Sequence, residues 1–235
     1  MRFQDWCSRY LIDPDTGESW KPWPYQLVAL ENRSSRKFQR WARRTGKTKA
    51  LAAEVLHYAH TFEAEYPGTA LVLAPQKAHL ANLFDTIRAF LSASPELNKL
   101  ICRNKQGNPQ IISFASASDR LVPDFTIKGI ACGEGGLSAR GQDADKIFLE
   151  EAAWISGNVL NHVAMPILLT HERIELSAYS TPSGLEDWFY HKCIEYGAHH
   201  VPVHSRPDMN DERMESINKE FENCPEAWLH QAVAL

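Results

Sequence analysis

One short stretch constrains the fold of this chain more than any other: residues 42–48, which read Ala-Arg-Arg-Thr-Gly-Lys-Thr. Residues 37–41 before it have the character of a strand, and residues 48–58 after it carry apolar side chains at helical spacing. A strand, a tight turn and a helix in this order form a phosphate-binding loop, because N–H groups at the helix start converge on an anion. Trp41 stands where the full GxxxxGK[ST] pattern has its first glycine, so the prediction depends on this setting as well as on the motif.

The loop assigns a role to each of its last four residues. Thr45 and Gly46 would present backbone N–H groups to phosphate, and Gly46 would let the chain approach it closely. Lys47 would reach the β- and γ-phosphate oxygens, and the Thr48 hydroxyl would hold Mg²⁺. The expected ligand is therefore a nucleoside triphosphate with Mg²⁺.

Composition and charge indicate a soluble globular protein with one core. The chain has 235 residues, of which 44% are apolar and 23% charged, with no apolar run long enough for a membrane span. Five scattered cysteines without a CxxC pair favour reduced thiols in a cytosolic setting. The net charge of −4 argues against a protein that coats nucleic acid by bulk attraction. Residues 32–53 nevertheless contain many basic and no acidic side chains, which favours contact with a polyanion around the loop.

Runs of strand length alternate with helical segments along the chain. Strands are predicted at residues 37–41, 69–75, 109–115, 125–131, 146–149, 173–179 and 198–203. Helices are predicted at residues 25–31, 48–58, 77–92, 157–169, 185–196 and from 211 onward. This alternation predicts an α/β fold in which a mostly parallel sheet is covered on both faces. Residues 202–210, with two prolines, are the expected linker to a small helical appendage.

A second chemical signal is a pair of acids, Glu150 and Glu151, at the end of the apolar strand 147–149. Ligands of open parallel sheets lie beyond the carboxyl ends of the strands, so these acids should meet the phosphate loop. Glu150 would hold Mg²⁺ together with Thr48, although an aspartate is more usual there, and Glu151 would polarise the attacking water. The alternative is an ordinary strand end with two solvated acids.

Two further segments carry weaker signals. The strand 176–179 delivers Ser180 and Thr181 to its carboxyl end, where either hydroxyl would sense the γ-phosphate or its loss. Upstream, the amide of Gln26 has the geometry to pair with adenine N6 and N7, which would favour ATP over GTP. The alternatives are a plain turn for the first segment and a helix-capping glutamine for the second.

In this order the motifs resemble the ATPase domain of large terminase subunits, the DNA-packaging motors of tailed bacteriophages and related viruses. The resemblance is carried by residues 23–26 (Trp-Pro-Tyr-Gln), 42–48, Arg140-Gly141 ahead of 147–153, and 180–182 (Ser-Thr-Pro), and it covers nearly the whole chain. It implies a RecA-like P-loop NTPase core at residues 1–205 and a lid-like helical segment at 206–235. Members of the family also carry a C-terminal nuclease domain, which has no counterpart here, so no nuclease activity is expected.

The resemblance also implies a function and partners. The expected activity is hydrolysis of ATP with Mg²⁺ that drives double-stranded DNA into a procapsid. The expected partners are double-stranded DNA, the portal protein and the small terminase subunit. The chain would form a homo-oligomeric ring on the procapsid and would be a monomer in isolation. It would act in the host cell cytoplasm and would not bind a membrane.

Phosphoryl transfer needs a cation for the charge that develops on the γ-phosphate. Arg43 and Arg44 lie in the loop and would supply it in cis. Arg140 precedes the strand of the two acids and should lie near its amino end, so it is a candidate for a trans arginine finger that reaches a neighbour's site; in terminases an arginine so placed is proposed to act in trans. A structural salt bridge is the alternative role for Arg140.

Two other functions remain open on the sequence. A helicase-like, DNA-dependent ATPase would use the same loop, acids and glutamine, although monomeric helicases need two such folds in one chain. A nucleotide-binding switch module without appreciable hydrolysis would be compatible with Glu150 and with the missing first glycine.

Overall fold

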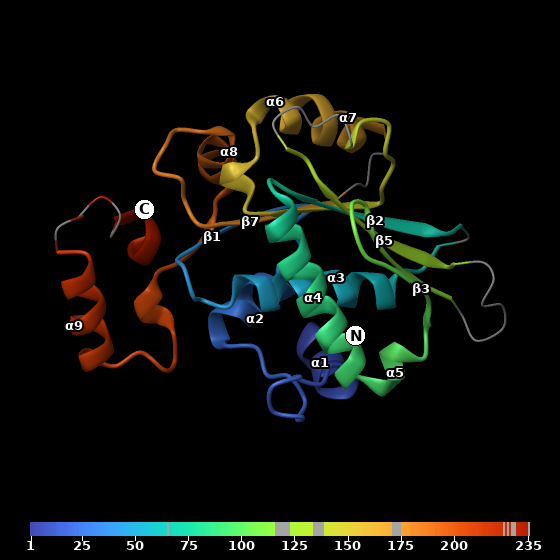
Figure 1. Ribbon diagram of the computed structural model, residues 1–235, viewed down its shortest axis with the longest axis horizontal. Coiled ribbons are helices and arrows are strands. Elements are labelled where there is room, and N and C mark those ends of the chain that lie inside the picture. Colours follow the sequence, from blue (N-terminus) through green and yellow to red (C-terminus); the bar gives the residue numbers. More distant parts are fainter. Residues whose placement is uncertain are drawn as a thin grey trace.

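The computed structural model describes residues 1–64, 66–115, 123–133, 139–170, 175–222, 224, 226 and 229–234. Within them, eight strands form one sheet in the order β3-β4-β5-β2-β6-β7-β1-β8 (Figure 1). Their bounds are β1 (Arg36–Trp41), β2 (Gly68–Ala74), β3 (Ile101–Lys105), β4 (Gln110–Phe114), β5 (Phe125–Ala131), β6 (Lys146–Glu150), β7 (Glu175–Ser180) and β8 (His199–Val201). The neighbours from β5 to β8 run parallel, whereas β4 is antiparallel to both β3 and β5.

Helices cover both faces of this sheet (Figure 1). One face carries α1 (Phe3–Tyr10), α2 (Pro24–Glu31), α3 (Lys47–Thr61), α4 (Lys77–Ala93) and α5 (Pro95–Asn98). The opposite face carries η2 (Ala152–Trp154), α6 (Gly157–Val159), η3 (Leu160–Ala164), α7 (Met165–Thr170) and α8 (Trp188–Tyr196). The short η4 (Val203–Ser205), α9 (Asp211–Glu220) and η5 (Leu229–Val233) lie at the end of the sheet where β8 is the edge strand and β1 its neighbour.

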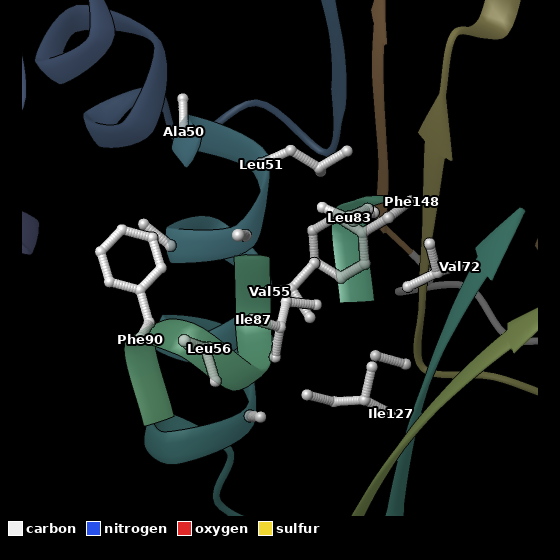
Figure 2. Close-up of a cluster of buried hydrophobic side chains, with 14 of the residues drawn as sticks. Ala50, Leu51, Val55, Leu56, Val72, Leu83, Ile87, Phe90, Ile127 and Phe148 are labelled. Carbon is white, nitrogen blue, oxygen red and sulfur yellow. The ribbon is translucent and has the colours of Figure 1, made fainter. Parts of the chain in front are cut away.

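The core between α3, α4 and the sheet fixes the helix that follows the phosphate loop. Figure 2 shows Leu51 and Val55 of α3 and Ile87 of α4 facing Val72 and Phe148 of the strands, and all of these side chains are fully buried. Small residues along α3, such as the buried alanines 50, 52 and 53, let the helix lie close to its neighbours. Burial on this scale holds α3, and with it the loop, in a defined place on the sheet.

The sequence prediction of a mostly parallel α/β sheet is confirmed, with one difference at the edge. The pattern does not predict β3, because residues 103–105 are exposed and show no alternation of apolar and polar side chains. As a result, the antiparallel pairing of β3 with β4 and of β4 with β5 was also missed. Residues 173, 174, 223, 225, 227, 228 and 235, which belong to predicted helices and strands, lie outside the described residues.

The strand order decides where the chemistry gathers. β6, β7 and β1 are consecutive parallel neighbours, so their carboxyl ends lie side by side along the same end of the strands. The phosphate loop follows β1, the two acids end β6, and Ser180 ends β7. Among the described residues, no helix is both long and apolar enough to cross a membrane.

Candidate nucleotide-binding site

The loop between β1 and α3 has the sharply turned backbone that anion binding requires. Gly46 (φ +73°) and Arg44 (φ +60°) are both left-handed, and α3 begins directly after the glycine. The Thr45 hydroxyl is buried and donates to the carbonyl of Ala42 at 2.7 Å, which closes the turn from inside. The first N–H groups of α3 therefore face the space beyond β1, as predicted for a phosphate site.

Side chains of helix α2 form hydrogen bonds with the backbone of this loop. The Gln26 amide nitrogen donates to the carbonyls of Thr45 (3.4 Å) and Gly46 (3.3 Å), and its oxygen accepts from the Trp23 backbone N–H at 2.8 Å. The Tyr25 hydroxyl also donates to the Thr45 carbonyl, at 2.9 Å. Both ends of the Gln26 amide thus bind the protein, and the capping arrangement weighed against adenine pairing is present. Adenine pairing stays a prediction, and it would require the amide to exchange these partners.

The contact between Gly46 and Gln26 makes a testable prediction for stability. A Cβ on Gly46 would lie 2.5 Å from the Gln26 amide nitrogen, whereas a Cβ on Gly17, which has the same φ of +73°, would meet nothing within 4 Å. Both alanine variants carry the left-handed penalty of about 1–2 kcal/mol, so Gly46→Ala should be the more destabilising one because it also displaces Gln26. Denaturant unfolding of the two variants checks this prediction. Equal losses in the free energy of unfolding would show that the contact with Gln26 adds no penalty at position 46.

Lys47, the first residue of α3, is buried at the centre of the site. Its ammonium group donates to the Thr181 hydroxyl at 2.8 Å and to the carbonyls of Trp41 and Ala42 at 3.4 and 3.2 Å. Burial lowers the pKa of Lys47 from its ordinary value, and the carboxylates of Glu151 and Glu150 oppose this shift. Its hydrogen-bond acceptors are neutral oxygens, which the charged oxygens of a phosphate would outcompete.

Thr48 and Glu150 form the candidate metal site. The Thr48 hydroxyl donates to Glu150 Oε1 at 3.2 Å, so the longer side chain of glutamate reaches Thr48 directly. Glu150 Oε2 is buried without a hydrogen-bond partner among the described residues, and burial together with the nearby Glu151 raises the pKa of Glu150 to about 8. An orphaned carboxylate oxygen beside a hydroxyl fits Mg²⁺, which takes few protein oxygens and completes its shell with phosphate and water.

Glu151 lies next to Lys47 in a strained conformation. Its backbone is left-handed (φ +51°), which is uncommon for a residue with a side chain and typical of functional sites. The carboxylate accepts from the Thr181 backbone N–H at 3.1 Å and from the Ser180 hydroxyl at 3.3 Å, and its other oxygen lies 3.9 Å from Lys47 Nζ. The side chain is 20% exposed, so it is oriented by β7 and remains accessible to water.

The two predicted sensor residues occupy different positions. Thr181 contacts Lys47 directly through its hydroxyl. The single proton of the Ser180 hydroxyl is shared between the Thr181 carbonyl and the Glu151 carboxylate, and its oxygen accepts from the Ala153 N–H. Thr181 therefore lies beside Lys47, where the γ-phosphate is expected. Ser180 contacts the Glu151 carboxylate instead. A role in sensing stays a prediction for both residues.

The position of Trp41 explains the departure from the full loop motif. Its indole is fully buried and packs edge-on against Tyr25 and Tyr179, with ring centroids 5.4 and 5.5 Å away. Residue 41 therefore belongs to the core, and the turn that needs left-handed residues begins after it.

The sequence matches one protein family over most of its length. Residues 41–200 match the family described as "Terminase large subunit, T4likevirus-type, N-terminal". This chain belongs to the large terminase family. The resemblance predicted from the motifs is thereby confirmed, as is the predicted function of a viral DNA-packaging motor domain. Among curated protein sequences, none matches significantly.

Solved structures support the same fold. The ATPase domain of the Thermus phage P74-26 large terminase is 18% identical, with a TM-score of 0.74, over 92% of this chain and 94% of that one. The HK97 bacteriophage large terminase is 14% identical, with a TM-score of 0.76, over 100% of this chain and 54% of that one. A large terminase from a thermophilic bacteriophage, in complex with ADP, is 15% identical, with a TM-score of 0.66, over 90% and 53%. The predicted RecA-like fold is confirmed, and this chain spans about half the length of the HK97 and ADP-bound terminases.

Arg43 and Arg44 face a cleft between the phosphate loop and the C-terminal segment of this terminase. The cleft has a volume of about 490 Å³, and both arginines are exposed in its wall. The other charged side chains of the wall come from the turn between η4 and α9 and from α9 itself; they are Arg206, Asp208 and Arg213. Asp208 binds both Arg206 and Arg213, so the cleft has a surplus of positive charge next to the loop.

Arg140 is not brought to the site of its own chain. It is exposed in the connection between β5 and β6, beside His162, Val163, Pro166 and Ile167 of η3 and α7. Two residues further along the chain, the Gln142 side chain accepts a hydrogen bond from Lys128, which lies in the middle of β5. The chain then continues to β6. Arg140 thus lies on the connection that leads to β6, beside η3 and α7. Its position near the amino end of β6 and its trans role in this terminase stay predictions.

Proposed function

We propose that this terminase domain binds ATP with Mg²⁺ in the phosphate loop and hydrolyses it, using Glu151 to polarise the attacking water. One observation supports this most strongly: Lys47, Thr48, Glu150, Glu151 and Thr181, from three separate segments, are joined by direct contacts. ADP bound to the thermophilic phage terminase, which has this fold, is in line with the proposal.

Each residue has a defined task in this mechanism. The loop N–H groups and Lys47 would bind the phosphates, and Thr48 with Glu150 would hold Mg²⁺, which neutralises the charge that develops during transfer. Glu151 is oriented by the Thr181 N–H and the Ser180 hydroxyl, which leaves one carboxylate edge to accept a hydrogen bond from water. Arg43 or Arg44 would supply a cation in cis, and Arg140 would supply one to a neighbouring subunit.

The remaining parts of the proposal extend to the assembly. Residues 206–235 would act as a lid, since their side chains form one wall of the cleft and Ala232 and Ala234 pack with Ala42 at the base of the loop. Hydrolysis would drive double-stranded DNA into a procapsid, with the domain in a homo-oligomeric ring that works with the portal protein and the small terminase subunit. This would take place in the host cell cytoplasm.

Phosphate release from ATP tests the proposal and separates it from the alternatives. A motor is expected to show turnover that depends on Mg²⁺ and is absent in EDTA. A switch module would bind the nucleotide with negligible release in both conditions, and a helicase-like enzyme would turn over but would not support packaging into procapsids. Negligible release by a domain assembled with portal-bearing procapsids and DNA would contradict the proposed hydrolysis.

A further inference from the structure

Glu54, on the third turn of α3, lies fully buried in a network that the mechanism above does not use. Its side chain is 4% exposed, and its carboxylate accepts hydrogen bonds or ion pairs from two lysines and two hydroxyls. Lys146 Nζ lies 3.2 Å from Oε1, the Ser177 hydroxyl 2.8 Å from Oε1 and the Tyr179 hydroxyl 2.8 Å from Oε2, and Lys37 is also ion-paired to Oε1. An ionised carboxylate offers about four acceptor sites, so four donors match its full hydrogen-bonding capacity.

These donors come from the three strands that carry the nucleotide site. Lys37 is in β1, Lys146 begins β6, and Ser177 and Tyr179 are in β7. At their carboxyl ends the same strands lead to the phosphate loop, to Glu150 and Glu151, and to Thr181. Glu54 is thus bonded to all three strands from the helix that begins with Lys47.

The contacts of α3 with these strands occur at two levels. Side chains four residues apart share a face of a strand, so Lys146 and Glu150 of β6 point to α3, separated by about 13 Å. On α3, Glu54 follows Lys47 by seven residues, which is two turns or about 10 Å. The upper level joins Thr48 to Glu150 and Lys47 to Thr181, and the lower level joins Glu54 to Lys146 and Ser177. Two levels of contact fix both the position of α3 along the strands and its rotation.

A buried ionic network is by itself weak evidence that its residues stabilise the fold, because well-packed apolar residues of similar volume often give equal stability. Directional bonds to three strands have a different consequence: they specify one placement of the helix. If α3 shifted, the phosphate loop would move with it and keep its N–H groups, while Thr48 would separate from Glu150.

We infer that Glu54 is a positioning residue, which places Thr48 on α3 against Glu150 on β6 so that both reach one metal ion. The inference deepens the proposed function and rests on it. It predicts that loss of the Glu54 network weakens the coupling between Mg²⁺ and nucleotide more than it weakens nucleotide binding itself.

Calorimetric binding of a non-hydrolysable ATP analogue, with and without Mg²⁺, tests this without turnover. In the wild type, Mg²⁺ should raise analogue affinity by about tenfold or more. In Glu54→Gln the effect should fall to about twofold, while affinity without Mg²⁺ stays within about threefold of the wild type. Tyr179→Phe removes one of the four donors with little change in shape, and it should show an intermediate Mg²⁺ effect.

Ile112→Ala is the matched control, because Ile112 is fully buried in β4 and β4 does not border the strands of the site. It should lower the melting temperature and leave the Mg²⁺ effect intact. A folded Tyr179→Phe variant with the full wild-type Mg²⁺ effect would overturn the inference, and so would an Ile112→Ala variant that loses the effect equally. If the wild type failed to bind the analogue, the proposed function itself would fall, which is a distinguishable result.

Discussion

Replacing Glu151 with glutamine is expected to reduce ATP turnover by about a thousandfold, while ATP affinity changes little. The amide keeps the size of the side chain and its contacts with β7, but it lacks the negative charge that polarises water. Since the carboxylate makes a 3.9 Å contact with Lys47 rather than a close ion pair, its loss should not release the lysine. Phosphate release and analogue binding, measured on the same preparation, check both parts of the prediction.

Glu186→Gln is a suitable control for this experiment. Glu186 lies in the segment between β7 and α8, outside the contacts that join Lys47, Thr48, Glu150 and Glu151. It should retain turnover. Equal, negligible rates for the wild type and Glu151→Gln would instead favour the nucleotide-binding switch over the motor.

Replacing Arg140 with alanine is expected to reduce turnover in the assembled ring by roughly a thousandfold or more, the usual worth of an arginine finger. The monomer should bind nucleotide almost normally, because Arg140 lies beside η3 and α7 and away from its own phosphate loop. Comparable loss of affinity in the isolated domain would indicate a cis or structural role.

Mixing inactive subunits distinguishes a trans arginine from one that acts within its own subunit. In a ring of Arg140→Ala and Glu151→Gln subunits, some interfaces would combine an intact Glu151 with an intact Arg140 from the neighbour. Partial recovery of phosphate release is therefore expected on mixing, under conditions in which the wild type is active. An arginine acting in cis would give no recovery at any ratio.

Much of the fold and of the site could be predicted because local patterns and strand order act together here. The apolar runs at β2 and β6 indicate buried parallel strands, and the carboxyl ends of such strands gather ligands. This is why Glu150, Glu151 and Thr181 could be placed near Lys47 without coordinates. In the structure Lys47 contacts Thr181, and Thr181 contacts Glu151. Glu150 contacts Thr48, the residue after Lys47.

Other features depend on tertiary contacts that no local pattern reports. Gln26 has the same sequence signature whether it pairs with a base or caps a helix, and only the fold shows its amide against the phosphate loop. Tyr25 lies in the Trp-Pro-Tyr-Gln motif of residues 23–26, yet a hydroxyl that donates to the Thr45 carbonyl cannot be inferred from spacing. Glu54 was missed because an acid within an amphipathic helix ordinarily faces water, and its partners are distant in sequence.

The central claim is that a triphosphate with Mg²⁺ binds where Lys47 begins α3, opposite Glu150 and Glu151. A crystal structure of this domain with a non-hydrolysable ATP analogue and Mg²⁺ tests it most directly. We expect the γ-phosphate against Lys47 and Thr181, the cation between Thr48 and Glu150, and a water beside Glu151. Analogue bound elsewhere, or a cation held without Thr48 and Glu150, would contradict the account.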